Sequence, residues 1–285
     1  MAKIIDGKKL AEKIKDDIVK EIQKLPSRPG LAILLVGERP DSKSYVNLKE
    51  REGKKCGIDT HLYKFPENIS EKEILNAIEF LNNDETIDGI LLQLPLPKNF
   101  NTNKIVNAIN PNKDVDGFHS ENLKKINNKK NNYIMPPLAG VILEMLKEYN
   151  IDIKSKNIAI TAHSDIFMQG VGNILRRNGG DILPCNYDGL SENSLKECLK
   201  KGDIIITAIG KKNYLDSSYI KKGAVIIDIG IIKEEDKTYG DVNFEDVKNI
   251  ASYITPVPGG VGPMTIACAF QNVLQLYKNH KVVKP

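Results

Sequence analysis

Tyr45 and Lys49 are residues whose types and spacing could carry chemistry. On a helix, residues four apart project from the same face, so the phenol and the amine would lie together. A lysine that is held near a phenol and away from water has a lowered pKa and can shuttle protons. The pair alone also fits an ordinary helix surface, so a catalytic role needs further residues at the same place.

The same spacing, Tyr-x-x-x-Lys, is the catalytic pair of short-chain dehydrogenases. In that class the pair lies inside the dinucleotide-binding domain, after the glycine-rich turn that holds the cofactor. Here the pair lies far upstream of the segment that resembles a cofactor domain, which begins near residue 157. The order of the segments therefore argues against the short-chain class.

Gln93 lies at the carboxyl end of an apolar segment, 87–94, that predicts a buried central strand. In open α/β sheets, ligands bind beyond the carboxyl ends of the strands. A buried amide needs hydrogen-bond partners, and Lys49 or a substrate amide would serve. Leu94 and Pro95 follow in a stretch with two Leu-Pro dipeptides, which stiffen the chain and of which one could be cis.

Two further segments could bind a flat polar ligand. Asp116 follows Asp114 and Val115 and precedes a glycine, and a fixed carboxylate can grip an amino-pyrimidine edge through two parallel hydrogen bonds. The segment 254–265 contains three prolines and three glycines, which make a rigid loop whose backbone can approach a flat ligand closely. It leads into a predicted helix with Thr265 as its N-cap, and helix N-termini favour anions and polar groups.

The elements that must position these residues alternate between strands and helices. In the first half, the pattern predicts strands over 31–36, 60–65 and 87–94. It predicts helices over 5–25, from Ser42 or Ser44 to about 55, and over 71–83. The last of these helices begins with a Ser70–Glu73 capping box. We expect a polar surface linker at 124–132. In the second half, the pattern predicts helices over 138–149, 168–178, 192–200 and 265–277, with a short turn and helix over 241–250. It predicts strands over 157–162, 181–185, 203–209 and 224–229, and a last strand over 251–255. This alternation predicts an α/β fold with two domains, an N-terminal parallel-sheet domain and a C-terminal Rossmann-like domain.

The composition excludes several classes of protein. With 285 residues, 41% hydrophobic residues and 27% charged residues, a soluble globular fold is expected. The net charge of +4 is spread over many Lys and Glu residues, so we expect no nucleic-acid partner. No apolar run approaches the roughly 20 residues that span a bilayer, and the N-terminus lacks the apolar stretch of a signal peptide. We therefore expect a cytoplasmic protein with no membrane partner.

The cysteines and histidines are scattered, without a Cys-x-x-Cys or other metal-binding spacing. The residues are Cys56, Cys185, Cys198 and Cys268, and His61, His119, His163 and His280. We expect the cysteines to be reduced thiols and expect no metal site.

Five segments in order resemble the signatures of the bifunctional 5,10-methylenetetrahydrofolate dehydrogenase/5,10-methenyltetrahydrofolate cyclohydrolase family. They are SYVNLK at 44–49, DGILLQLPLP at 88–97, KDVDGFH at 113–119, GDVNF at 240–244 and ITPVPGGVGPMT at 254–265. The resemblance covers essentially the whole chain. It implies a folate-binding catalytic domain over 1–140 plus 265–285, because the last helix returns to it, and a dinucleotide-binding domain over 141–264.

The resemblance also implies roles for individual residues. Lys49 is the expected catalytic lysine, Tyr45 positions the pterin and assists it, and Gln93 hydrogen-bonds to Lys49 and tunes it. Asp116 anchors the pterin ring. The other expected substrate-binding residues are Leu94, Pro95, Gly259, Gly260, Val261 and Pro263. The expected cofactor is NADP, with NAD as the alternative, bound by His163, Ser164, Ile166, Gly210, Ile229, Gly230, Ile231 and Thr265. Tetrahydrofolate derivatives are the expected partners, and a homodimer formed through the cofactor domains is expected.

The sequence departs from the family at the first turn of the cofactor domain. The family shows G-R-S-x-I-V-G-x-P, whereas residues 162–170 read Ala-His-Ser-Asp-Ile-Phe-Met-Gln-Gly. Gly170 and Gly172 could restore close backbone approach from a displaced position. After the second strand, Asp188 suits a ribose 2′-hydroxyl, and hence NAD, better than a 2′-phosphate.

Three functions follow as hypotheses. The leading one is the bifunctional enzyme, which oxidises the methylene form and hydrolyses the methenyl form to 10-formyltetrahydrofolate. The second is a cyclohydrolase whose dehydrogenase activity is weak or lost because of the altered turn at 162–170. The third is a folate-binding or scaffolding protein without catalysis, against which the intact Lys49 argues, since binding alone needs no proton shuttle.

Overall fold

The computed structural model describes residues 1–128, 130–163, 165–235 and 237–282. The chain forms two compact units. The three-stranded unit contains residues 12–137 and the C-terminal segment from residue 266. The six-stranded unit contains residues 1–11 and 138–265. Three helices have residues in both units: α1 (Gly7–Ile22), α6 (Pro137–Glu148) and α10 (Val261–Val282).

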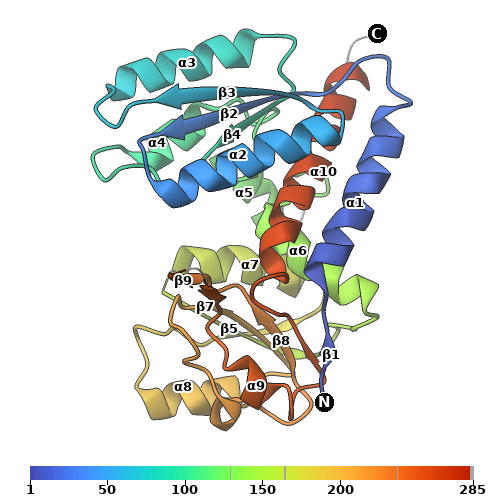
Figure 1. The fold of residues 1–285 in the computed structure, drawn as a ribbon, viewed down its shortest axis with the longest axis vertical. Coiled ribbons are helices and arrows are strands. Elements are labelled where there is room, and N and C mark those ends of the chain that lie inside the picture. The colour runs from blue at the N-terminus through green and yellow to red at the C-terminus, as the bar shows by residue number, and fades with distance from the viewer. Residues whose placement is uncertain (129, 164, 236, 283–285) are drawn as a thin grey trace. The chain divides into compact units, whose positions relative to one another are not determined.

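The three-stranded unit is built on a parallel sheet in the order β3-β2-β4. Its strands are β2 (Gly30–Val36), β3 (Asp59–Phe65) and β4 (Gly89–Leu92), and its helices are α2 (Pro40–Lys55), α3 (Glu71–Asn83), α4 (Thr102–Ala108) and α5 (Ser120–Asn127). Figure 1 shows α2 and α3 flanking this sheet. The predicted Ser70–Glu73 capping box is present at the start of α3.

The side chains of β2 alternate between two hydrophobic cores, as the period of a strand requires. Leu31, Ile33 and Leu35 face one core, which also holds Val46 of α2 and Phe270 of α10. The even-numbered side chains of β2 face the other core, together with the apolar side of α3. Because β2 is buried on both faces, it reads as a continuous apolar run in the sequence.

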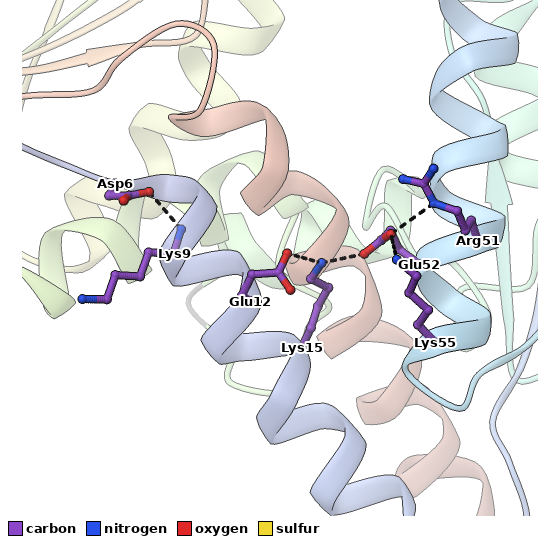
Figure 2. Close-up of polar contacts among 7 residues, drawn as sticks. All are labelled: Asp6, Lys9, Glu12, Lys15, Arg51, Glu52 and Lys55. Atoms are coloured by element: carbon purple, nitrogen blue, oxygen red, sulfur yellow. Dashed lines mark hydrogen bonds and ion pairs between the residues drawn. The ribbon is translucent and has the colours of Figure 1, made fainter.

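A network of ion pairs joins α1 to α2 in the three-stranded unit (Figure 2). Lys15 Nζ lies 2.7 Å from Glu12 Oε1 and 2.6 Å from Glu52 Oε2. Glu52 also binds Lys55 at 2.9 Å and Arg51 at 3.3 Å. The hydrogen bonds from Lys15 and Lys55 lower the pKa of Glu52 to about 2. The network therefore fixes α2, the helix that carries Tyr45 and Lys49, against α1.

The six-stranded unit is built on a parallel sheet in the order β1-β11-β8-β7-β5-β6. Its strands are β1 (Lys3–Ile4), β5 (Asn157–Ala162), β6 (Asp181–Pro184), β7 (Ile204–Ala208), β8 (Val225–Asp228) and β11 (Tyr253–Ile254). The helices α7 (Asp165–Arg177), α8 (Glu192–Leu199) and α9 (Phe244–Val247), the 3₁₀ turn η1 (Ser217–Tyr219) and the antiparallel hairpin β9 (Ile232–Glu234) and β10 (Lys237–Tyr239) complete it. The order with β5 inside the sheet is that of a Rossmann-like unit.

The predicted two-domain α/β class is confirmed, with differences at several boundaries. Residues 1–11 lie with the six-stranded unit instead of the predicted first domain, because β1 pairs with β11. Helix α2 begins at Pro40 with Arg39 as its N-cap, so neither Ser42 nor Ser44 caps it. The predicted linker 124–132 begins inside a helix, since α5 extends to Asn127.

The cysteine prediction was wrong for one pair. Cys185, which follows β6, and Cys198 of α8 form a disulfide. The two cysteines are 13 residues apart in the sequence, and their pairing could not be predicted because it depends on α8 packing beside the sheet. Cys56 and Cys268 are buried and are not part of this disulfide. None of the helices in the described ranges is both long and apolar enough to span a membrane.

Candidate active site and cofactor site

The Lys49 amine is buried in the three-stranded unit. Tyr45 and Lys49 lie on successive turns of α2, and Lys49 Nζ lies 4.8 Å from the centre of the Tyr45 ring. Only 7% of Lys49 is exposed, and this burial lowers its pKa, while the charge of Asp116 acts in the opposite direction. The amine can therefore exist in its neutral form, which accepts a proton, far more readily than a surface lysine.

Gln93 holds the amine from the end of β4. Its backbone N–H donates to the Leu34 carbonyl at 2.9 Å, which continues the sheet pairing by one residue. Its side-chain Oε1 accepts from Lys49 Nζ at 3.1 Å, and its Nε2 donates to the Leu94 carbonyl at 2.7 Å. Because both ends of the amide are engaged, its acceptor oxygen is directed at Lys49. The Leu94–Pro95 peptide that follows is cis.

Asp116 reaches the same edge of the sheet through a bridge beside β4. The N–H of Val115 donates to the Ile90 carbonyl, and the parallel bridge between Ile90 and Asp114 places Asp116 level with the last residue of β4. The turn that follows is held by Asp114, whose carboxylate accepts from Gly117 N at 3.0 Å and His119 N at 2.8 Å. Gly117 has a φ of +68°, and a Cβ there would lie 2.7 Å from the Ile134 carbonyl oxygen.

The Asp114 carboxylate is buried, the Asp116 carboxylate is half-buried, and each affects the other's charge. Burial raises the pKa of Asp116 to about 6, with Lys49 lowering it and Asp114 raising it. Burial likewise raises the pKa of Asp114 to about 6, against the effect of the backbone N–H groups that it accepts. Lys49, Gln93 and Asp116 thus form one site of an amine, an amide and a carboxylate at the carboxyl end of β4.

A pocket of about 140 Å³ lies in the six-stranded unit, at the carboxyl end of β8. Its lining residues are Asp228, Ile229, Gly230, Ile231, Thr238, Pro256, Val257, Pro258, Gly259, Gly260, Val261, Gly262 and Pro263. The pocket brings together three predicted cofactor residues and four predicted substrate residues. Gly259 has a φ of +104°, which explains why a glycine stands in this loop.

Two buried carboxylates support the loops around this pocket. Asp241 accepts from Thr207 Oγ1 at 2.8 Å, and from three backbone N–H groups, those of 209–211, at 2.7 to 2.9 Å. Asp228 accepts from Gly230 N at 2.9 Å and from the N–H groups of Asp241 and 242. Burial, and next the charge of Asp241, raise the pKa of Asp228 to about 7. The sequence analysis missed both residues, although Asp241 lies in the GDVNF signature.

A second polar group lies where β5, β6 and β7 end. We call His163, Tyr187, Asp188 and Lys211 the ribose-end cluster. His163 Nδ1 lies 2.9 Å from both Asp188 carboxylate oxygens, and Lys211 Nζ donates to Tyr187 Oη at 2.5 Å. Gly210 precedes Lys211 with open space beside it, so a ligand could approach its backbone.

Several predicted cofactor residues stand elsewhere. Ser164 lies outside the described residues, and of Ile166 only the backbone, in α7, is described. Thr265 lies inside α10, which begins at Val261, and its hydroxyl donates to the Gly262 carbonyl at 2.7 Å, so the predicted N-cap was wrong.

The two glycines expected to restore the altered turn lie within helix α7. A Cβ on Gly172 would lie 3.1 Å from Ile182, so this glycine serves the packing of α7 on β6. A Cβ on Gly170 would meet nothing within 4 Å. Within the described ranges, no group of three or more His, Cys, Asp or Glu side chains is arranged to hold a metal ion.

Two family models match the chain. The model described as tetrahydrofolate dehydrogenase/cyclohydrolase, catalytic domain, matches residues 5–116. The model described as tetrahydrofolate dehydrogenase/cyclohydrolase, NAD(P)-binding domain, matches residues 136–281. The first contains Lys49, Gln93 and Asp116, and the second contains the pocket and the ribose-end cluster.

Full-length relatives and solved structures resemble the chain as well. The bifunctional protein FolD of Nautilia profundicola is 42% identical over 280 residues, which cover 97% of each chain. The crystal structure of the bifunctional FolD methylenetetrahydrofolate dehydrogenase/cyclohydrolase from Campylobacter jejuni is 37% identical, with a TM-score of 0.94, covering 98% of this chain and 99% of that one. The enzyme of Trypanosoma brucei, solved with NADP cofactor and inhibitor, is 28% identical, with a TM-score of 0.93, covering 100% of this chain and 99% of that one.

Proposed function

The chain belongs to the tetrahydrofolate dehydrogenase/cyclohydrolase family, and on this premise we propose how its own residues carry out the two reactions. The enzyme oxidises 5,10-methylenetetrahydrofolate to the 5,10-methenyl form with NAD(P), and hydrolyses the methenyl form to 10-formyltetrahydrofolate. The observation that carries the assignment of residues is the buried Lys49 amine, held 3.1 Å from the Gln93 amide oxygen.

We assign the proton transfers of the hydrolysis to Lys49. Water attacks the carbon of the methenyl bridge, and the attacking water must lose a proton while a ring nitrogen regains one as the bridge opens. A neutral amine with a lowered pKa can accept the first proton and return it. Gln93 positions this amine, because its oxygen is an acceptor for one of the N–H bonds and leaves the remaining donors and the lone pair for substrate and water.

The other residues of the three-stranded unit bind the substrate. The Asp116 carboxylate lies at the end of β4, where its charge acts on Lys49, and it can accept hydrogen bonds from the amino-pyrimidine edge of the pterin. Tyr45 presents a flat ring beside the amine, with Leu94 and Pro95 next to Gln93. In the six-stranded unit, the proposed substrate-binding residues are Gly259, Gly260, Val261 and Pro263, which line the pocket there.

The six-stranded unit holds the residues that fit the dinucleotide. Gly230 cannot carry a side chain, because a Cβ would lie 2.3 Å from Asp241 Oδ1, so the loop 229–231 presents its backbone to the pocket. Gly210 and His163 end the neighbouring strands, where a Rossmann-like unit binds its ligand. When bound, the nicotinamide accepts the hydride from the methylene carbon.

The alternative functions are not favoured. A cyclohydrolase without dehydrogenase activity would not need the pocket at β8 or the backbone donors that Asp241 holds at 209–211. A scaffold without catalysis would not need a buried amine whose pKa is lowered by burial.

We also propose that the protein is a cytoplasmic homodimer, in which the two copies contact each other through their six-stranded units. Light scattering tests the dimer, and cell fractionation tests the compartment.

Absorbance tests the two activities separately. Purified protein is mixed with 5,10-methylenetetrahydrofolate and NAD or NADP, and formation of the methenyl form is followed. In a second assay, methenyltetrahydrofolate is supplied alone and its loss is followed. We expect both signals, and no methenyl formation with either cofactor would overturn the proposed oxidation.

A further inference from the structure

The ribose-end cluster contains a carboxylate where a Rossmann-like unit meets the adenosine ribose of its cofactor. Strands β5 and β6 are the first two strands of this unit after α6, and Asp188 follows the second of them. An acidic residue after the second strand accepts hydrogen bonds from ribose hydroxyls, whereas a nearby cation accommodates a 2′-phosphate. The side chains of Asp188 and His163 are 59% and 48% exposed, so a ligand can reach both.

The carboxylate is held in place before any ligand binds. The N–H groups of Asp188 and Gly189 both donate to Asn186 Oδ1 at 2.9 Å, which closes a tight turn. Cys185, at the start of this turn, is tied to α8 by the disulfide. The Nδ1–H of His163 donates to the two Asp188 oxygens, each 2.9 Å away, and fixes their direction.

The cations nearby are already engaged. Lys211 Nζ donates to Tyr187 Oη and lies 4.8 Å and 5.6 Å from the ring centres of Tyr187 and Tyr214. The hydrogen bond to Tyr187 is the main cause that raises the pKa of Lys211, so the amine stays charged. The charge of the Lys211 ammonium is offset by that of the Asp188 carboxylate, whereas a 2′-phosphate adds about −1.5 to −2.

We infer that this chain selects NAD over NADP, and that Asp188 is the residue that makes the selection, by accepting hydrogen bonds from the 2′- and 3′-hydroxyls of the adenosine ribose. The inference rests on the proposed function, because it concerns the cofactor of that oxidation. A carboxylate is an acceptor only, so it pairs with hydroxyl donors and repels a phosphate.

Equilibrium binding tests this without the reaction. Isothermal titration calorimetry measures the affinity of the full-length protein for NAD, NADP, 5′-AMP and 2′,5′-ADP at low ionic strength. We expect NAD and 5′-AMP to bind at least about tenfold more tightly than their 2′-phosphorylated counterparts, a difference of about 1.4 kcal/mol. In Asp188→Asn we expect the preference to fall about tenfold or more.

Asp181→Asn is the matched control, because it removes the same charge from the exposed amino end of the same strand β6. It should leave the preference unchanged, and melting curves establish that each variant is folded. Tighter binding of NADP by the wild type, or an Asp188→Asn preference equal to that of the wild type, would overturn the inference. A protein that prefers NAD yet oxidises no substrate would instead overturn the proposed function alone.

Discussion

The Asp241 carboxylate holds the backbone of a loop that we propose to bind the cofactor, so its substitution tests how the structure supports cofactor binding. We consider Asp241→Asn, which keeps the shape of the side chain but replaces one acceptor oxygen by an N–H₂ donor. In the wild type, Oδ1 accepts from the N–H groups of Gly210 and Lys211, and Oδ2 accepts from Ile209 N and Thr207 Oγ1. In either orientation of the amide, at least one buried N–H faces a donor instead of an acceptor.

The cost follows from these contacts. The best orientation places the new N–H₂ at the Oδ2 position, because the Thr207 hydroxyl can turn to accept, and only Ile209 N then loses its partner. A hydrogen bond to a charged group contributes about 1.5–3 kcal/mol, and an unsatisfied buried donor costs about 1–3 kcal/mol. Relief of the repulsion with Asp228 offsets part of this loss. We expect the free energy of unfolding to fall by about 2–5 kcal/mol.

Two assays read out the substitution. Urea unfolding, followed by circular dichroism, measures the loss of stability relative to the wild type and to Asp181→Asn. Titration with NAD and NADP measures the cofactor affinity, which should fall because the loop 209–211 loses its support. Hydrolysis of methenyltetrahydrofolate should be retained at a temperature where the variant is folded, because Lys49, Gln93 and Asp116 lie in the three-stranded unit.

The outcome can contradict this reasoning in two ways. A loss of stability below about 1 kcal/mol would mean that Asp241 does not satisfy the four donors as described. Equal losses of cofactor affinity and of methenyl hydrolysis in the folded variant would mean that its effect is not confined to the cofactor loops.

Three further predictions concern the three-stranded unit. Asp116→Asn removes the charge that raises the pKa of Lys49, so this pKa falls further. We expect the acid limb of the pH–rate profile of methenyl hydrolysis to move to lower pH. A shift to higher pH, or the same shift in the surface control Asp16→Asn, would refute the coupling. Gln93→Leu removes the oxygen that accepts a hydrogen bond from the Lys49 amine. We expect kcat of the hydrolysis to fall about 10²-fold with a smaller change in KM. An effect on KM alone would contradict a positioning role for Gln93. Because the pKa of Glu52 is lowered from 4.5 to about 2, its ion pairs stabilise the fold above pH 4.5, and this contribution disappears as the pH falls toward 2. Thermal melts of Glu52→Gln should lack this part of the loss of stability in acid. The exposed control Glu67→Gln should retain it.

Local patterns in the sequence were sufficient to predict most strands and helices of the two parallel sheets. Buried parallel strands such as β2 read as apolar runs, and the Ser70–Glu73 capping box marks the start of α3, because both depend on neighbouring residues. The approach of Lys49 to Gln93 was also predicted, because α/β sheets gather their ligand sites at the carboxyl ends of strands.

Features that depend on distant contacts could not be predicted in this way. The two residues of β1 form a strand only because β11 lies beside them, and the disulfide exists only because α8 packs near the end of β6. Asp228 and Asp241 read as ordinary acidic residues, and their role is set by backbone N–H groups from separate loops. The start of α10 at Val261 was missed because glycine and proline there predict a loop.

The central claim is that Lys49 handles the protons of the hydrolysis, and one measurement tests it directly. The rate of methenyltetrahydrofolate hydrolysis is compared in the wild type, Lys49→Met and Lys49→Arg, after melting curves have shown that each variant is folded. We predict that both variants lose about 10²–10⁴-fold in kcat, since neither offers an amine that can accept and return a proton near neutral pH. Hydrolysis by folded Lys49→Met at the wild-type rate would contradict the account.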